Sequence, residues 1–192
     1  MHKEYTFTPK FKLIVDHLKA VRTLDEYVNG VALKKDMQAF SNDLQQDISY
    51  SVLHPAGWEG LQAYDGSLYA SPKSKWRVLE DDEIAVAIYP AWPVQDPEKD
   101  EPYVELYVPA NWEKRVQFIT KLKIPPGFEH VNQYPDGELA EGTSIFKYVR
   151  YTSYIGAEGL FDSIRFLAAF RDATQALVDM EKDIDEILDG PT

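Results

Sequence analysis

The long stretches in which apolar residues recur at helical spacing lie at the two ends of the chain, and this arrangement restricts the possible folds more than any other feature. Residues 9–28 and about 31–48 each carry one apolar stripe, and so does the segment of roughly 158–188. Between them, from Tyr50 to Tyr154, the apolar residues fall in short runs typical of strands. Because these runs are not separated by long helices, we expect mainly antiparallel pairing.

The sequence therefore predicts an α+β fold. An N-terminal helical hairpin would span 1–49, a central, mainly antiparallel sheet 50–155, and a long C-terminal helix, packed on the sheet, 156–190. A length of 192 residues and 44% hydrophobic residues favour a single domain over 1–192 with a core of its own.

The helix boundaries are well marked in the sequence. Thr8 suits the N-cap of the first helix and Pro9 its first position, and Asn29-Gly30 would end it before the second helix. Gly190-Pro191 ends the last helix, which would be about 45 Å long. A helix of that length can project beyond a small sheet, so we consider a homo-oligomer formed through it.

The central region contains the signals of several strands. Asp65-Gly66 lies between two short apolar runs and indicates a hairpin turn. Trp76–Leu79 reads as a third strand, and the apolar run Ile84–Tyr89 as a central one. Tyr103–Val108 alternates and suits a strand with one side in water. Later segments are expected as a short helix (111–122), for which a strand is the alternative, a long surface loop (125–143) and a strand (144–154).

Negative charge is concentrated in two blocks of the chain. Residues 51–110 hold 11 acids and 4 bases, and residues 156–192 hold 9 acids and 3 bases, within a net charge of −12. The bases form no patch that could neutralise phosphates, which argues against direct nucleic-acid binding. The asymmetry favours a basic partner surface or serves solubility alone.

Common catalytic, metal and cofactor motifs are absent from the sequence. There is no cysteine, no HExxH pair among the four histidines, no GxSxG and no phosphate-binding glycine loop. We expect no catalytic residue, no metal and no cofactor. No apolar run is long enough for a membrane span and no apolar signal core follows Met1, so we expect no membrane association and a cytoplasmic location.

Acids at alternate positions of 96–101 resemble the start of a calcium loop. Glu101 stands where that loop needs glycine, and Tyr107 where it needs a bidentate glutamate. A solvated hairpin tip is the simpler interpretation. The last helix also ends in acids, where the helix dipole disfavours them by about 0.3–1 kcal/mol each.

Tryptophans and tyrosines are dense near the first acidic block, and aromatic rings beside acids suit an arginine-rich surface. Our leading hypothesis is a non-catalytic acidic interaction domain that binds a basic partner, with an inhibitor of a nucleic-acid-binding groove (a DNA mimic) as its sharper form. The expected partner-binding residues are Glu80, Asp81, Asp82, Glu83, Asp96, Glu98, Asp100, Glu101, Asp179, Asp183 and Glu186. The alternative is a small-ligand-binding or hydrolytic site beside the sheet near His54 and Trp58, with Tyr64 and the acids of 80–83.

Overall fold

The computed structural model describes residues 23, 31–62, 67–72, 75–90, 102–133, 139–156 and 162–190. The chain divides into two compact units, Met1–Phe40 and Ser41–Thr192. The predicted first helix, and with it the helical hairpin, lies outside the described residues except for Thr23, which is helical. The single domain over 1–192 therefore stays a prediction.

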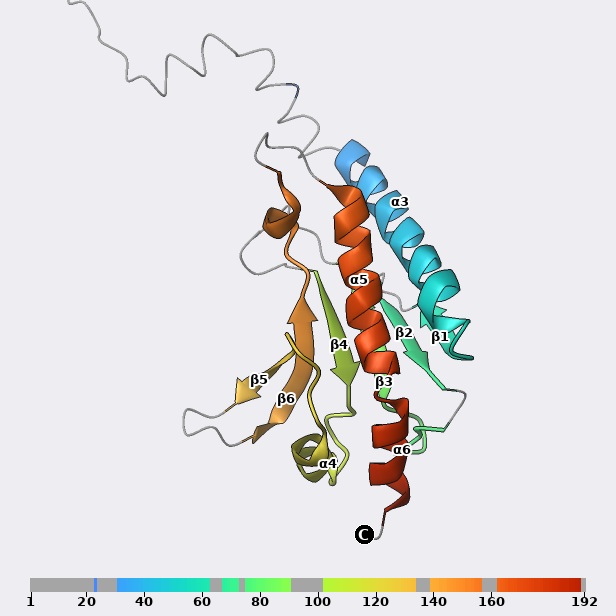
Figure 1. Ribbon diagram of the computed structural model, residues 1–192, viewed down its shortest axis with the longest axis vertical. Coiled ribbons are helices and arrows are strands. Elements are labelled where there is room, and N and C mark those ends of the chain that lie inside the picture. Colours follow the sequence, from blue (N-terminus) through green and yellow to red (C-terminus); the bar gives the residue numbers. More distant parts are fainter. Residues whose placement is uncertain are drawn as a thin grey trace, which may run out of the picture. The chain divides into compact units, whose positions relative to one another are not determined.

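A six-stranded sheet forms the centre of the second unit, and every neighbouring pair in it is antiparallel. Together with the helices it confirms the predicted α+β class (Figure 1). The strands lie in the order β1-β2-β3-β4-β6-β5. Their bounds are β1 Glu59–Gln62, β2 Leu68–Ser71, β3 Ala85–Tyr89, β4 Tyr103–Tyr107, β5 Glu129–Gln133 and β6 Leu139–Tyr148.

Helices occupy the places that the apolar stripes indicate. The second predicted helix is confirmed as α3, Val31–Ile48, which continues into a turn of π-helix, η1, at Ser49–Leu53. The short helix predicted at 111–122 is α4, Arg115–Lys121. The remaining helical segments are η2 Tyr151–Tyr154, α5 Ser163–Val178 and α6 Glu181–Asp189.

The core lies between α5 and one side of the sheet, where α5 contacts β3 and β4 (Figure 1). Phe166, Phe170 and Leu177 of α5 are fully buried, as are Val86 and Leu106 of the strands. Each such side chain stabilises the fold by about 1.5–3 kcal/mol relative to exposure. The central position predicted for the apolar run of β3 is confirmed, because β3 has strands on both sides.

The end of α3 packs beside α5. Leu44 and Ile48 are fully buried there. Asp47 accepts two hydrogen bonds from the guanidinium of Arg171 on α5, both 2.6 Å long. A bidentate pair of this kind fixes geometry as well as adding energy, so it sets the position of α5 along the end of α3.

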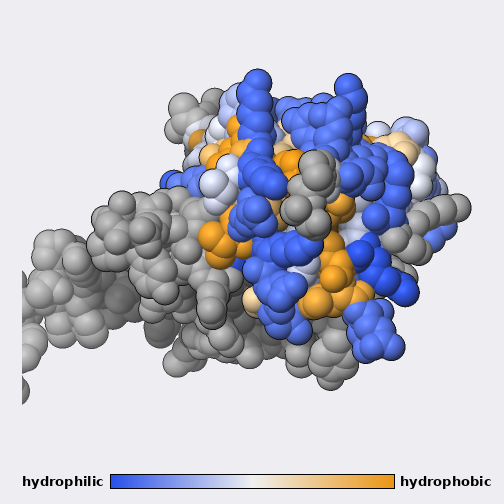
Figure 2. All heavy atoms as spheres, turned by 90° about the horizontal axis from the view of Figure 1, so that it is seen from below, coloured by the Kyte–Doolittle hydropathy of each residue, from blue (hydrophilic) through white to orange (hydrophobic). Residues whose placement is uncertain are grey.

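The long C-terminal helix is confirmed, but a turn at Asp179-Met180 divides it into α5 and α6. It begins later than the stripe suggests, at Ser163, because Asp162 caps it by accepting a hydrogen bond from the backbone N–H of Arg165. Figure 2 views the molecule from below, where apolar residues show between hydrophilic ones.

The strand predicted at Trp76–Leu79 is wrong. The segment instead makes a tight turn, in which the N–H groups of Val78 and Leu79 donate to the carbonyl of Asp82. The Trp76 ring is fully buried and its indole N–H donates to Asp185 on α6. The segment is apolar because it packs under a helix, so its composition resembles that of a strand.

The long loop predicted at 125–143 is also wrong in part, since it contains β5 and the beginning of β6. Gly127, at φ +81°, turns the chain, and β5 then pairs with β6 at the sheet edge. The predicted strand 144–154 ends early, at Tyr148, because Tyr151–Tyr154 forms a 3-10 helix.

Candidate functional site

The side of the sheet that faces away from α5 is lined by tyrosines, and we call it the tyrosine face. In the register of the sheet, Tyr69 and Glu105 both lie opposite Ala87, which puts these three side chains on one side. The tyrosine face consists of Tyr69 of β2, Tyr89 of β3, Tyr103 and Tyr107 of β4, and Tyr148 of β6. All five side chains are half-buried.

The rings of the tyrosine face touch one another across four strands. Tyr89 stacks on Tyr103, with centroids 4.4 Å apart. Tyr69 meets Tyr89 and Tyr107 edge to face, at 5.9 and 5.6 Å, and its hydroxyl hydrogen-bonds that of Tyr89. Tyr148 approaches Tyr103 at 6.1 Å. Such ring pairs contribute about 0.5–1.5 kcal/mol beyond the burial of their area, so the array is held in place before anything binds.

Two hydroxyls of this face, those of Tyr89 and Tyr107, have a raised pKa. Burial and the hydrogen bond with Tyr69 raise the pKa of Tyr89. Burial and the hydrogen bond to Asp82 raise the pKa of Tyr107 to about 12. These two hydroxyls are therefore neutral groups that can donate or accept hydrogen bonds.

Glu105 lies among these rings and is buried, with only 9% of its surface exposed. The prediction that this side of β4 lies in water is therefore right only in part, because Tyr103 and Tyr107 are half-exposed whereas Glu105 is buried between them. Burial raises the pKa of Glu105, although the Ser144 hydroxyl and the charge of Arg115 act in the opposite direction. Arg115 is buried as well, and its Nε donates to the carbonyl of Val108 at 3.0 Å.

The acids of 80–83, which we call the acidic turn, lie beside the tyrosine face. Asp82 accepts a hydrogen bond from the Tyr107 hydroxyl at 3.0 Å, and Glu83 accepts one from the Ser71 hydroxyl at 2.7 Å. Asp82 and Glu83 are half-buried, whereas Glu80 and Asp81 are exposed. Two predicted binding residues thus support the edge of the face, and two are accessible next to it.

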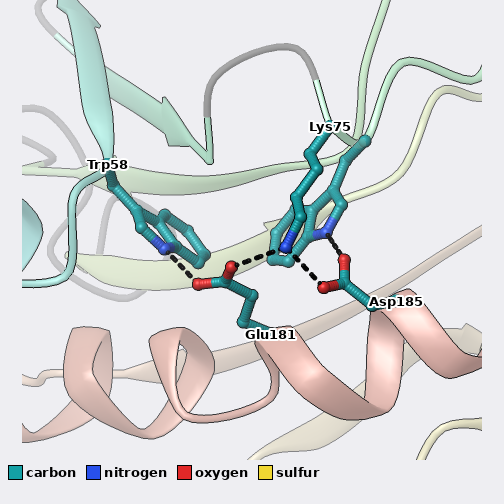
Figure 3. A network of polar contacts seen from close by, with 5 residues as sticks. Trp58, Lys75, Glu181 and Asp185 are labelled. Carbon is teal, nitrogen blue, oxygen red and sulfur yellow. Dashed lines mark hydrogen bonds and ion pairs between the residues drawn. The ribbon is translucent and has the colours of Figure 1, made fainter.

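Two acids of α6 form hydrogen bonds with tryptophans that precede β1 and β3. Glu181 accepts a hydrogen bond from the indole N–H of Trp58 at 2.8 Å, and Asp185 accepts one from Trp76 at 2.9 Å (Figure 3). Lys75 donates to both carboxylates, at 3.2 and 2.7 Å. The two indole rings meet edge to face at 4.8 Å. We call these five residues the tryptophan clamp.

The three predicted binding residues of the C-terminal helix, Asp179, Asp183 and Glu186, are exposed, and we call them the outward acids. Asp179 accepts a hydrogen bond from the Gln175 amide at 2.7 Å, and Lys182 lies 3.5 Å from Glu186. Asp179 ends α5, and Asp183 and Glu186 lie on α6. Asp82 and Glu83 of the acidic turn bond to residues on the tyrosine side of the sheet.

The other predicted site residues are not gathered with these. Asp96, Glu98, Asp100 and Glu101 lie outside the described residues, as does Tyr64. For the alternative site, His54 is exposed in the turn after η1, while the buried Trp58 directs its N–H toward Glu181 (Figure 3).

The spacing of residues in the sequence predicted only some of the side-chain groupings described here. Glu181 and Asp185 stand four apart on one helix face, but their indole donors lie more than 100 residues earlier and no local pattern indicates them. The alternation of β4 does place Glu105 with Tyr103 and Tyr107, although it does not reveal that Glu105 is buried.

Within the part of the chain that the structure describes, no three acidic or histidine side chains lie close enough together to hold a metal ion. No helix among those residues is long and apolar enough to cross a membrane. Comparisons with protein-family models, with curated proteins and with solved structures give no match for this chain.

Proposed function

We propose that this chain is a non-catalytic interaction domain that binds a basic protein surface on its tyrosine face. The observation that carries the proposal is the row of half-buried tyrosines next to the carboxylates of the acidic turn. Tyrosine is enriched at protein interfaces because it offers a large, rigid apolar surface together with one polar group.

A guanidinium suits this face better than other groups. It stacks on aromatic rings and donates to carboxylates in one geometry. The chain itself provides an example at the rim of the face, where the Arg150 guanidinium lies 5.4 Å from the centre of the Tyr148 ring. The net charge of −12 would speed the approach of a basic partner and repel nucleic acid.

The sharper form of the proposal, an inhibitor that occupies a nucleic-acid-binding groove, would use the outward acids. They are exposed on a helix, where charges recur at a spacing of the same order as phosphates along a strand, about 3.4 Å. We further propose a cytoplasmic location and, through the C-terminal helix, a homo-oligomer. Light scattering after size exclusion would test the oligomer.

Two matched double variants test which surface binds. Glu80→Gln/Asp81→Asn and Asp183→Asn/Glu186→Gln each neutralise one glutamate and one aspartate that are exposed, so they change net charge equally. The probe is a fluorescent peptide of Arg-Gly repeats, measured by anisotropy at low salt. We expect the first variant to weaken binding about fivefold, as for loss of exposed ion pairs, and the second to change it less than about twofold.

A third variant tests the rings. Tyr148→Leu should weaken the same peptide, whereas Tyr50→Leu, which removes a 65% exposed tyrosine from η1, should not. A Lys-Gly peptide should bind more weakly than the Arg-Gly peptide. Equal loss in both double variants would mean that charge alone acts, and a larger loss at 183 and 186 would favour the groove inhibitor.

A further inference from the structure

A half-open pocket of about 210 Å³ lies between α4 and α6, apart from the tyrosine face. Its walls are mostly apolar. Trp112 and Phe118 form the α4 side, Ile187 and Leu188 the α6 side, and Val78 belongs to the turn before β3. Apolar residues surrounded by hydrophilic ones are visible from below, the side on which these helices lie (Figure 2).

Contacts within the fold fix both walls of the pocket. The rings of Trp112 and Phe118 lie 5.4 Å apart, tilted by 57°, and Phe118 is 2% exposed. The α6 wall is held in place by the tryptophan clamp, because Asp185, two residues before Ile187, accepts hydrogen bonds from Lys75 and Trp76. A ligand would thus meet a preformed surface.

The rim of this pocket is positive, in contrast to the rest of the chain. Lys114, Gln117 and Lys121 are exposed and line it. Spaced three and four apart, they lie along one side of α4. Neither lysine forms an ion pair with any described carboxylate. The acids next to lining residues in the sequence, which do not themselves line the pocket, are Glu113, Glu186 and Asp189.

We propose that this pocket binds a small aromatic carboxylate. An apolar cavity of about 150 Å³ accommodates benzene, so 210 Å³ admits one substituted ring between Trp112 and Leu188. The carboxylate would accept hydrogen bonds from the Gln117 amide and from a lysine on either side of it. Apolar walls with a few convergent polar groups are the usual composition of a ligand site. This site is independent of the proposed function.

The test is a titration of the isotope-labelled full chain, followed by proton–nitrogen correlation NMR, with phenylacetate and its neutral analogue phenylacetamide. We expect phenylacetate to shift the Trp112 indole signal saturably, with a dissociation constant of about 1 mM for so few atoms. The amide should bind about fivefold more weakly. The buried indoles of Trp58 and Trp76, which belong to the clamp, are internal controls and should shift little.

The double variant Lys114→Gln/Lys121→Gln should weaken phenylacetate about fivefold and leave the amide unchanged. Lys35→Gln/Lys123→Gln removes the same charge from two exposed lysines that do not line the pocket and is the matched control. Leu188→Ser should weaken both compounds. Equal binding of acid and amide, equal effects of the two lysine variants, or no saturable shift of Trp112 would each overturn the proposal.

Discussion

The tyrosine face and the tryptophan clamp each hold a carboxylate against aromatic rings, yet the two carboxylates respond in opposite ways. In the clamp, burial alone would raise the pKa of Asp185, but the hydrogen bonds from Lys75 and Trp76 together lower it below the ordinary value. On the tyrosine face, burial raises the pKa of Glu105 in spite of Ser144 and Arg115.

The two carboxylates respond differently because different hydrogen-bond donors surround them. The clamp offers a lysine and an indole N–H, groups that only donate and so favour the ionised carboxylate. Near Glu105 the hydrogen-bond donor is the Ser144 hydroxyl, and tyrosine rings surround the carboxylate. Arg115 donates its Nε–H to the Val108 carbonyl. The clamp is therefore stabilised by its charges, whereas the tyrosine face tolerates its buried charge, as expected of a surface selected for something other than stability.

The largest expected effect comes from removing the clamp carboxylates. Glu181→Ala/Asp185→Ala leaves the N–H groups of Trp58 and Trp76 without acceptors, at about 1–3 kcal/mol each if they stay buried, so the free energy of unfolding should fall by about 2–5 kcal/mol. Urea unfolding followed by tryptophan fluorescence, with circular dichroism as a second probe, measures it.

The outward acids supply the control for this prediction. Asp183→Ala/Glu186→Ala removes the same two residue types from the same helix, and it should change the free energy of unfolding by less than about 1 kcal/mol. It can even stabilise α6, because acids near a helix C-terminus oppose the dipole. If both variants lost equal stability, the clamp would have no special role.

A smaller effect concerns pH. Because the pKa of Asp185 in the fold lies below 3.8, its contribution to stability is present above that pH and is lost as pH falls through the folded pKa. Wild type should exceed Asp185→Asn in melting temperature at neutral pH, and the gap should close in acid. In a Lys75→Met background this difference in melting temperature should change less with pH, since Lys75 helps to lower the pKa of Asp185. An equal change with pH in both backgrounds would contradict the role of Lys75.

Local patterns predicted most of the elements of this fold, and contacts between distant residues explain the failures. The stripe of Leu44 and Ile48 lies within one helix, so its period alone was sufficient to predict α3. Trp76 was assigned to a strand because its burial under α6 depends on Asp185, 109 residues later. β5 was missed because pairing with β6 outweighs the turn residues around it.

The candidate site was predictable only in composition. Aromatic residues beside acids suggested an arginine-binding surface, but the sequence did not show that the acidic turn joins the tyrosine face through Asp82 and Glu83. That contact depends on strand register, which decides the side on which Tyr107 and Ser71 meet these two acids.

The smallest expected effect, and the sharpest test of the comparison, is Glu105→Gln. The amide keeps an acceptor for the Ser144 hydroxyl and removes a charge that burial disfavours. Since the folded pKa is raised above 4.5, ionisation of Glu105 destabilises the fold above that pKa, and this penalty disappears as pH falls below 4.5. The variant should therefore be more stable than wild type at neutral pH, by less than about 1 kcal/mol, with no gain in acid.

Asp185→Asn is the counterpart in the clamp and should show the opposite sign in the same melting series. A Glu105→Gln variant that is less stable at neutral pH would mean that the charge of Arg115 outweighs the burial of Glu105, and the two regions would then follow one rule. A gain would mean that the chain keeps a carboxylate among tyrosines at a cost in stability. Residues that lower the stability of the fold are typical of binding surfaces, so a gain in stability of Glu105→Gln would support the tyrosine face as the site.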